Sequence, residues 1–557
     1  YCGDDLGRCP FSEKQSNGEG IPASVVDEEI YRRLPSLLIA TADKFAQMPW
    51  RGETQMLFGR VNGYCTRHGY RSPEIRDSDS HPKRRQLPPA KTISVGRLRP
   101  PDLIIQDELH LISGPLGTLV GLYETAIEQL SSWEVDGKTV RPKVIASTAT
   151  IRHAGSQINS LYLRRVNIFP PSGIDIEDNF FSRQREPSEE NPGRLYLGVC
   201  APGIRTKMVI IRVYVAYMAA AQQLFEKYGK AVDPYMTLVG YFNAMRELGG
   251  TRRTVEDSVR SRLRRMPERG LSRRFINPFN VEEMTSRKSA SDIPRILDRL
   301  EIQFEPGEER GGKGQNRPLD VLLATNMISV GVDVNRLGLM VVAGQPKTTS
   351  EYIQATSRVG RHHPGIVCIV YNWARPRDLS HYERFEHYHA TLYQNVEALS
   401  VTPFSPRARD RGLTGVFVSL IRLLREEFNK NTDASGITRE HPIIQTAIEA
   451  ISQRASLVEG SSEVGIEVRK ELEERLDEWL SKAQQVSSGG GQLGYRKERG
   501  TVTNLLEAAM GKQWTNFTCL NSLRDVEPNV GLVLDNFGMD RVSAPGDPTA
   551  EDGGEEA

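Results

Sequence analysis

The stretch Leu103-Ile104-Ile105-Gln106-Asp107-Glu108-Leu109-His110 decides the class of fold, because a short aliphatic run ends there in two adjacent acids. The run shows no alternation of apolar and polar residues, which is typical of a strand buried in a parallel sheet. We therefore predict an α/β protein. Similar runs, spaced widely enough to admit crossover helices, occur at residues 37–39, 144–146, 238–239, 321–323, 339–342 and 366–370.

The acidic pair at the end of the first run predicts a site for nucleotide hydrolysis. A strand that delivers two acids to its carboxyl end is how nucleotide hydrolases hold Mg²⁺. Asp107 would then meet the metal, and Glu108 would activate the attacking water. Taken alone, the pair also fits a plain helix cap.

Polar residues follow two other predicted strands in an order that supports hydrolysis. Residues 144–150 read VIASTAT, so hydroxyl groups, those of Thr148 and Thr150 among them, can bond the neighbouring acids and sense the γ-phosphate. After the run at 321–323, Gly331 would let the backbone approach phosphate closely. Asp333 would hold ribose or orient groups at the cleft.

Two arginines complete the ordered set. Residues 354–361 read QATSRVGR, which places Arg358 and Arg361 three positions apart and hence on one helical face. Arginines delivered from a second lobe to a triphosphate on the first stabilise the transition state, which raises the rate by roughly 10³ to 10⁵. Each arginine alone also fits a surface salt bridge, but the ordered set favours a nucleotide site.

Together these stretches resemble the motifs of superfamily 2 helicases, over about residues 35–373. The resemblance implies two RecA-like parallel-sheet lobes, ATP and Mg²⁺ as cofactors, and movement along nucleic acid. The matching stretches are TADK at 41–44 (motif Ib), DELH at 107–110 (II), STAT at 147–150 (III), LVGYFN at 238–243 (IV), ATNMISVGVDV at 324–334 (V) and QATSRVGR at 354–361 (VI).

The resemblance also implies roles for single residues. Asp107 is implied to bind Mg²⁺ and Glu108 to act as general base. Arg361 is implied to be the arginine finger and Arg358 to contact phosphate. The residues implied to contact the nucleic-acid backbone are Thr41, Lys44 and Thr325, and those implied around the nucleotide are Gln354, Gly331, Asp333, Thr148 and Thr150.

Two features depart from the family pattern. Ser357 stands where a glycine usually precedes the first arginine of motif VI. More important, the sequence has no GxxxxGK[S/T] phosphate loop, since the GGKG at 311–314 lacks the spacing and the hydroxyl partner. Because the chain begins at Tyr1 and the loop precedes motif Ib in helicases, we expect a truncated first lobe. We therefore expect this chain alone to bind ATP poorly and to be inactive.

Longer strings resemble the helicase subunit of the bacterial DISARM anti-phage system and its close relatives. They include VVDEEIYRRLPSLLIATADKFAQMPW at 25–50 and QDELHLISGPLGTLVGLYE at 106–124. The similarity implies a DNA-directed ATPase with a partner subunit and a methyltransferase as companions. Two alternatives stay open: a non-catalytic subunit that binds DNA or a partner, and an RNA-directed helicase, which shares every motif seen here.

Composition and periodicity predict the division of the chain. After about residue 400 the pattern becomes helical, with Leu472, Leu476, Trp479, Leu480 and Ala483 on one helix face. The predicted units are a partial first lobe at 1–168 with an inserted loop at 51–100, a connector at 169–205, a second lobe at 206–398, a helical extension at 399–486, a small unit at 487–540 and a disordered acidic tail at 541–557.

The overall composition is that of a soluble globular protein. The 557 residues include 72 Lys and Arg against 71 Asp and Glu, and 38% are hydrophobic, which excludes collagen-like and wholly disordered chains. The best apolar run, 208–221, carries Arg212 and is too short to span a bilayer, which takes about 18 residues; we expect no membrane association. Scattered cysteines and the lack of a signal peptide indicate the reducing cytoplasm.

Two further patterns leave alternatives open. Residues 252–274 hold nine arginines against three acids, which fits either a solvated surface helix or a nucleic-acid contact. Cys65-x-x-His68 lies in the inserted loop, and Cys2 and Cys9 lie near the start of the same lobe. These four side chains could close a tetrahedral Zn²⁺ site, and a chance group of loop thiols is about as good an account.

Overall fold

The computed structural model folds into two compact units. The first unit comprises residues 1–102, 119–142 and 403–557, and the second comprises 103–118 and 143–402. The first unit therefore contains both the N-terminal segment and the C-terminal helices. The predicted division of the chain into consecutive domains remains a prediction. The structure describes residues 1–2, 9–16, 20–84, 87–148, 154–171, 173–174, 178, 180–181, 183, 188, 193–289, 292–305, 317–329, 333–397, 400–498, 502–509 and 514–523.

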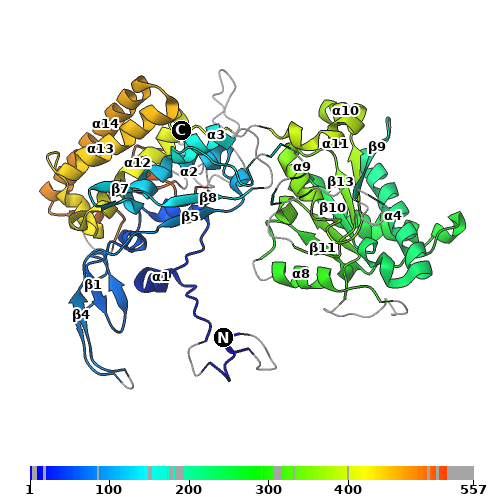
Figure 1. The fold of residues 1–557 in the computed structure, drawn as a ribbon, viewed down its shortest axis with the longest axis horizontal. Coiled ribbons are helices and arrows are strands. Elements are labelled where there is room, and N and C mark those ends of the chain that lie inside the picture. Colours follow the sequence, from blue (N-terminus) through cyan, green and yellow to red (C-terminus); the bar gives the residue numbers. More distant parts are fainter. Residues whose placement is uncertain are drawn as a thin grey trace, which may run out of the picture. The chain divides into compact units, whose positions relative to one another are not determined.

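A six-stranded sheet, parallel throughout, forms the centre of the second unit (Figure 1). The strand order is β11-β12-β10-β13-β14-β9, so the chain crosses the sheet several times through helices. The strands are β9 (Arg194–Cys200), β10 (Leu238–Phe242), β11 (Val281–Met284), β12 (Val321–Ala324), β13 (Leu339–Ala343) and β14 (Gly365–Tyr371). Every residue of β10, β12 and β13 is buried, as expected for aliphatic runs without alternation.

Helices cover both faces of this sheet, and successive residues of one strand serve opposite faces. Val239 and Tyr241 pack with α8 (Asp292–Glu301), α9 (Thr349–Thr356) and α11 (Phe385–Ala390). Leu238 and Phe242 pack on the other face, with α4 (Thr206–Tyr228) and the short helices of residues 251–269. The predicted α/β class is therefore confirmed for this unit.

Helix α4 is long and apolar enough, with the turn that follows it, to cross a membrane by length and composition alone. Half of its most apolar window is buried, and Val209, Tyr214 and Met218 pack against the sheet. These contacts are those of a core helix in a globular unit.

The second unit also contains a separate pair of parallel strands, β5 (Leu103–Gln106) and β8 (Lys143–Ala146). Leu103, Ile105 and Ile145 on these strands are 47%, 61% and 48% exposed. Among the residues that the structure describes, no layer covers this apolar face. These two strands differ from the expectation of fully buried strands, because the runs at 103–105 and 144–146 form strands that are only partly buried.

The remaining elements of the second unit are short connections around the two sheets. Part of the arginine-rich stretch is structural, because Arg274 is fully buried and its Nη2 lies 2.9 Å from Oδ1 of Asp320. These elements are Leu109–Leu111, α3 (Ala154–Tyr162), Gly229–Tyr235, α5 (Met245–Leu248), α6 (Thr251–Thr254), the π-helical turn Val255–Val259, α7 (Arg260–Leu263), Met266–Arg269, Pro278–Asn280, Asn326–Ser329, α10 (Pro376–Glu383) and Leu392–Asn395.

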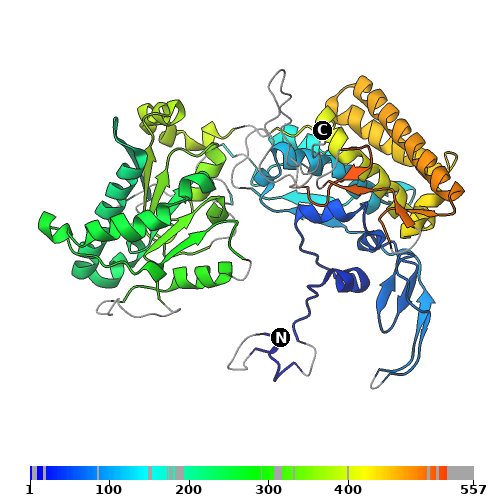
Figure 2. The ribbon, with the colours of Figure 1, turned by 180° about the vertical axis from the view of Figure 1, so that it is seen from behind.

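Long helices dominate the first unit, and α13 (Pro442–Glu459) and α14 (Ser462–Ser488) lie side by side (Figures 1 and 2). Leu472, Leu476, Trp479 and Ala483 of α14 are buried, which confirms the helix face expected from their spacing. Helix α12 (Pro406–Leu424) packs on α2 (Gly114–Ser131), where Gly415 leaves room for the hydroxyl of Tyr123.

Small sheets and turns complete the first unit. An antiparallel sheet of order β2-β1-β4-β3 lies within the predicted inserted loop. The remaining elements are α1 (Asp27–Arg33), Ala42–Gln47, Gly52–Phe58, β1 (Gly63–Cys65), β2 (Gly69–Arg71), β3 (Ser80–His81), β4 (Ala90–Ser94), β6 (Trp133–Val135), β7 (Lys138–Val140), Glu426–Phe428, Asn431–Gly436, β15 (Gln492–Gly494), β16 (Val502–Asn504), β17 (Glu507–Ala508) and β18 (Thr518–Cys519).

Buried charges join the inserted loop to the C-terminal helices within the first unit. The fully buried Arg422 donates to the carbonyl oxygens of Pro49 and Asn429 at 2.9 and 3.1 Å. Its Nη2 lies 3.4 Å from Oε2 of Glu74, and Arg496 lies 3.1 Å from the other oxygen of that carboxylate. Burial raises the pKa of Glu74, and Arg422 opposes that rise.

The packing of β10 on α4 gives a test of the fold. A Cβ at Gly240 would overlap the hydroxyl of Tyr214, so Gly240→Ala should lower the free energy of unfolding by about 1 to 3 kcal/mol. Adding Tyr214→Phe should restore much of the loss. Chemical denaturation measures both. Gly155→Ala is the matched control, because nothing lies within 4 Å of a Cβ there; an equal loss in both single variants would contradict the assignment.

Candidate active site

The parallel pairing of β5 with β8 brings the acidic pair next to Ser147. Gln106 pairs with Ala146 in the parallel register, so the residues that follow the two strands lie at the same end of the pair. The backbone N–H of Ser147 donates to the carbonyl oxygen of Gln106 at 2.9 Å, and the backbone N–H of Leu109 donates to the carbonyl oxygen of Ser147 at 2.9 Å. The hydroxyl of Ser147 donates to Oδ1 of Asp107. The hydrogen bond expected between the hydroxyls of one strand end and the acids of the other is therefore present.

The two acids differ in conformation and in partners. Oδ1 of Asp107 also accepts from the backbone N–H of Glu108 at 2.9 Å, and the Asp107 side chain is exposed. Glu108 has φ +50° and ψ +50°, a left-handed conformation that costs a residue with a side chain of the order of 1 to 3 kcal/mol. Such a backbone is common at functional sites.

His110 is a further buried member of this corner, and no role was predicted for it from the sequence. Its Nδ1 lies 3.3 Å from Oε2 of Glu108 and 3.4 Å from Oγ1 of Thr148. Burial lowers the pKa of His110, while Glu108 and a hydrogen bond with Gln354 oppose the shift. The neutral ring is therefore favoured, and it links the acidic corner to Gln354. The only signal in the sequence was its place in the stretch DELH.

The arginine-bearing segment follows helix α9. Gly360 has φ +71°, and a Cβ there would lie 2.7 Å from Cα of Gly365, so this turn requires glycine. The turn presents Arg361, which forms an ion pair with Asp333. Burial and the neighbouring Arg361 lower the pKa of Arg358, while Glu108 and Asp333 oppose the shift.

These electrostatic influences connect residues that are far apart in the sequence. Glu108 acts on both His110 and Arg358 within the second unit. Opposite charges influence a pKa strongly only at short range. The predicted general base thus opposes the lowering of the pKa of one predicted phosphate contact, Arg358, whose largest cause is burial. Asp333, predicted to hold ribose, is here the partner of Arg361.

The predicted nucleic-acid contacts are distributed over both units. In the first unit, Nζ of Lys44 lies 2.7 Å from Oδ2 of Asp27, and Thr41 precedes the turn Ala42–Gln47 without capping it. In the second unit, Thr325 follows β12 and is buried. Their contacts with nucleic acid remain predictions.

Several predicted features lie outside the described residues. They are Thr150, Gly331, the GGKG at 311–314 and the acidic tail at 541–557.

The cysteine prediction is only partly supported by the geometry. Sγ of Cys65 lies 3.8 Å from Nδ1 of His68. Within the described part of the chain, the group of close potential ligands contains these two residues and His81, but neither Cys2 nor Cys9. His81 was missed because its approach depends on the pairing of β3 with β4, which leaves no motif in the sequence.

Comparison with known proteins gives one family match and one similar relative. Residues 269–363, which include Thr325, Asp333, Arg358 and Arg361, match the helicase conserved C-terminal domain. The DISARM protein DrmA of Bacillus paralicheniformis is 46% identical over 468 residues, 83% of this chain. The chain spans 40% of the length of that protein.

Solved helicase structures resemble the chain more distantly. The DUF1998 helicase MrfA bound to DNA has 14% identity and a TM-score of 0.39, covering 64% of this chain and 41% of that one. The Mycobacterium smegmatis helicase Lhr bound to ssDNA and AMP-PNP has 12% identity and a TM-score of 0.35, covering 63% and 42%.

The environment of His110 predicts a pH dependence. Since its pKa is lowered by folding, the unfolded state binds the proton more readily below about pH 6.5, and stability should fall as the pH decreases through that range. His110→Gln should reduce this pH dependence, measured as the apparent unfolding temperature between about pH 7.5 and 5.5. His363→Gln, at an exposed position, is the control. An unchanged slope in His110→Gln would contradict the assignment.

Proposed function

The chain contains a helicase conserved C-terminal domain and is a relative of the DISARM protein DrmA, and from this premise we propose that it belongs to an ATP-dependent superfamily 2 helicase. The proposed helicase translocates along DNA in bacterial anti-phage defence, in the cytoplasm, together with a partner subunit. Because the chain spans 40% of the relative, the activity proposed is that of the whole protein.

One observation carries the proposal. The acid at the end of β5, Glu108, opposes the lowering of the pKa of Arg358, and Arg358 lies in the matched helicase domain. A carboxylate that activates water and a guanidinium that neutralises phosphate charge are the two chemical functions that phosphoryl transfer needs from side chains.

The residues around Asp107 fit a hard cation. Its exposed carboxylate is oriented by Ser147 and by the backbone N–H of Glu108, and carboxylate oxygens are the ligands that Mg²⁺ prefers. Bound there with ATP, Mg²⁺ would neutralise phosphate charge. Glu108 would orient and deprotonate the attacking water, and neutral His110 would hold the Glu108 carboxylate in place.

The sequence has no GxxxxGK[S/T] phosphate loop. The proposed activity therefore also needs the phosphate contacts that such a loop makes, and the stretches described above do not include that loop. We propose that Arg358 and Arg361 supply positive charge, with Arg361 leaving Asp333 to meet the transition state. The nucleic-acid contacts proposed for Thr41, Lys44 and Thr325 involve the phosphate backbone, so DNA binding should weaken with salt and depend little on sequence.

The general base gives the first test. Glu108→Gln keeps the size of the side chain but removes the base, so ATP turnover should fall by roughly 10² to 10⁴, while DNA binding stays unchanged. Turnover with and without single-stranded DNA is measured on the full protein that contains this chain. Asp102→Asn is the control, since Asp102 is exposed and forms a surface pair with Arg99.

The outcomes of this test separate the candidate functions. A folded parent that binds DNA without DNA-stimulated turnover, with its partner subunit present, would favour the clamp. Stimulation by RNA rather than DNA would favour an RNA-directed helicase.

The finger role predicts a different kinetic signature. Arg361→Ala should lower turnover by about 10³ to 10⁵, with much less effect on the dissociation constant of ATP. Single-turnover kinetics and nucleotide titration measure the two quantities. Arg295→Ala, which breaks only a surface pair with Asp292, is the matched control. Similar turnover in Arg361→Ala and the parent would remove the assignment.

A further inference from the structure

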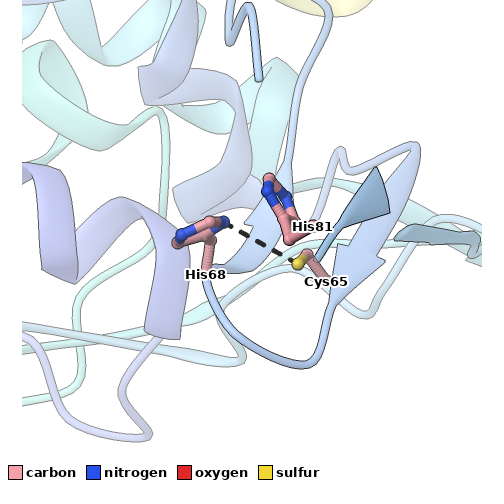
Figure 3. Close-up of side chains that lie close together, drawn as sticks. All are labelled: Cys65, His68 and His81. Atoms are coloured by element: carbon pink, nitrogen blue, oxygen red, sulfur yellow. Dashed lines mark hydrogen bonds between the residues drawn. The ribbon is translucent and has the colours of Figure 1, made fainter. Parts of the chain in front are cut away.

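Three potential metal ligands converge in the small antiparallel sheet of the first unit (Figure 3). Each of Cys65, His68 and His81 has a ligand atom within 4.8 Å of those of the other two. Sγ of Cys65 and Nδ1 of His68 are 3.8 Å apart, and the two imidazole rings are 4.4 Å apart between centroids. Ligands bound at about 2.0 to 2.3 Å in a tetrahedral Zn²⁺ site lie roughly 3.3 to 3.8 Å apart, and the distance between Cys65 and His68 is of this size.

The sheet itself produces this convergence. Cys65 faces Thr92 across β1 and β4, and His81 faces Ala90 across β3 and β4. Positions 90 and 92 lie two apart on β4, so both partners belong to the same face of the sheet. His68 enters from the turn between β1 and β2, where Cys65 pairs with Gly69.

One atom of this group is buried without a partner. Nε2 of His81 is buried and has no hydrogen-bond partner, which is costly for a polar atom unless it meets a ligand.

We propose that Cys65, His68 and His81 bind one Zn²⁺ ion, with water in the fourth position. A thiolate and two imidazoles are a donor set that suits Zn²⁺. This set replaces Cys2 and Cys9, expected as ligands from the sequence, with His81. The proposal does not depend on the helicase function.

The ion would stabilise the small sheet that carries its ligands. The four strands of this sheet contain two to five residues each, and so small a sheet is marginal without further support. The ion cross-links the turn between β1 and β2 to the edge strand β3. Asp77 strengthens the same corner, because it pairs with Arg32 of α1 at 2.6 Å and lies 4.0 Å from Nδ1 of His68.

Metal content and cobalt spectroscopy test the proposal on the full chain, purified without a metal-affinity step. The parent should hold one Zn²⁺ per chain by mass spectrometry and, after exchange, show the sulfur-to-cobalt charge-transfer absorption of Co²⁺. His81→Ala should weaken Zn²⁺ binding by more than about a hundredfold, since even residues behind the ligands are worth 10- to 100-fold. His68→Ala should behave alike, and His68→Cys should restore binding because a thiolate is an equivalent ligand.

Matched controls keep the result interpretable. Thr66→Ala changes an exposed residue in the same turn, and Cys2→Ser and Cys9→Ser remove the thiols outside the group; all three should keep the ion. Circular dichroism confirms that each variant is folded. A parent that takes up neither Zn²⁺ nor Co²⁺, or a folded His81→Ala variant that binds Zn²⁺ like the parent, would overturn the proposal.

Discussion

The parallel register between β5 and β8 is the constraint on which the candidate site depends. It places Gln106 beside Ala146, and everything downstream follows from that pairing. Ser147 then reaches Asp107, Glu108 adopts its left-handed backbone, and His110 is buried against both Glu108 and Thr148. A shift of one residue would turn these side chains to the opposite face of the strand pair. The chemistry of the corner is therefore set by backbone hydrogen bonds.

The parts of the structure that depend on local pattern could be predicted from the sequence. The runs at 238–239, 321–323 and 339–342 are buried strands because apolar layers lie on both sides of them. The face of α14 that carries Leu472 and Trp479 is buried because helical spacing alone places these residues together. The contact of Asp107 with a hydroxyl of the next strand follows from the rule that parallel strands end at one edge.

The parts that depend on pairing between distant segments could not be predicted. His81 joins Cys65 only because β3 adds to the far side of β4, and no spacing in the sequence encodes that choice. Glu74 and Arg422 also form a buried ion pair that the sequence does not predict, because the two residues lie far apart in the chain. Removing either partner of such a pair leaves an unpaired buried charge, which usually costs several kcal/mol. The inserted loop and the C-terminal helices thus pack within one compact unit.

The exposed face of β5 and β8 has a consequence for handling the chain. Leu103, Ile105 and Ile145 present apolar surface on two strands that, within the described residues, pair only with each other. Open strand edges next to apolar side chains are templates for pairing with other copies. The isolated chain should therefore self-associate as its concentration rises. Its solubility, rather than its activity, is then the first property to report whether another segment covers this face.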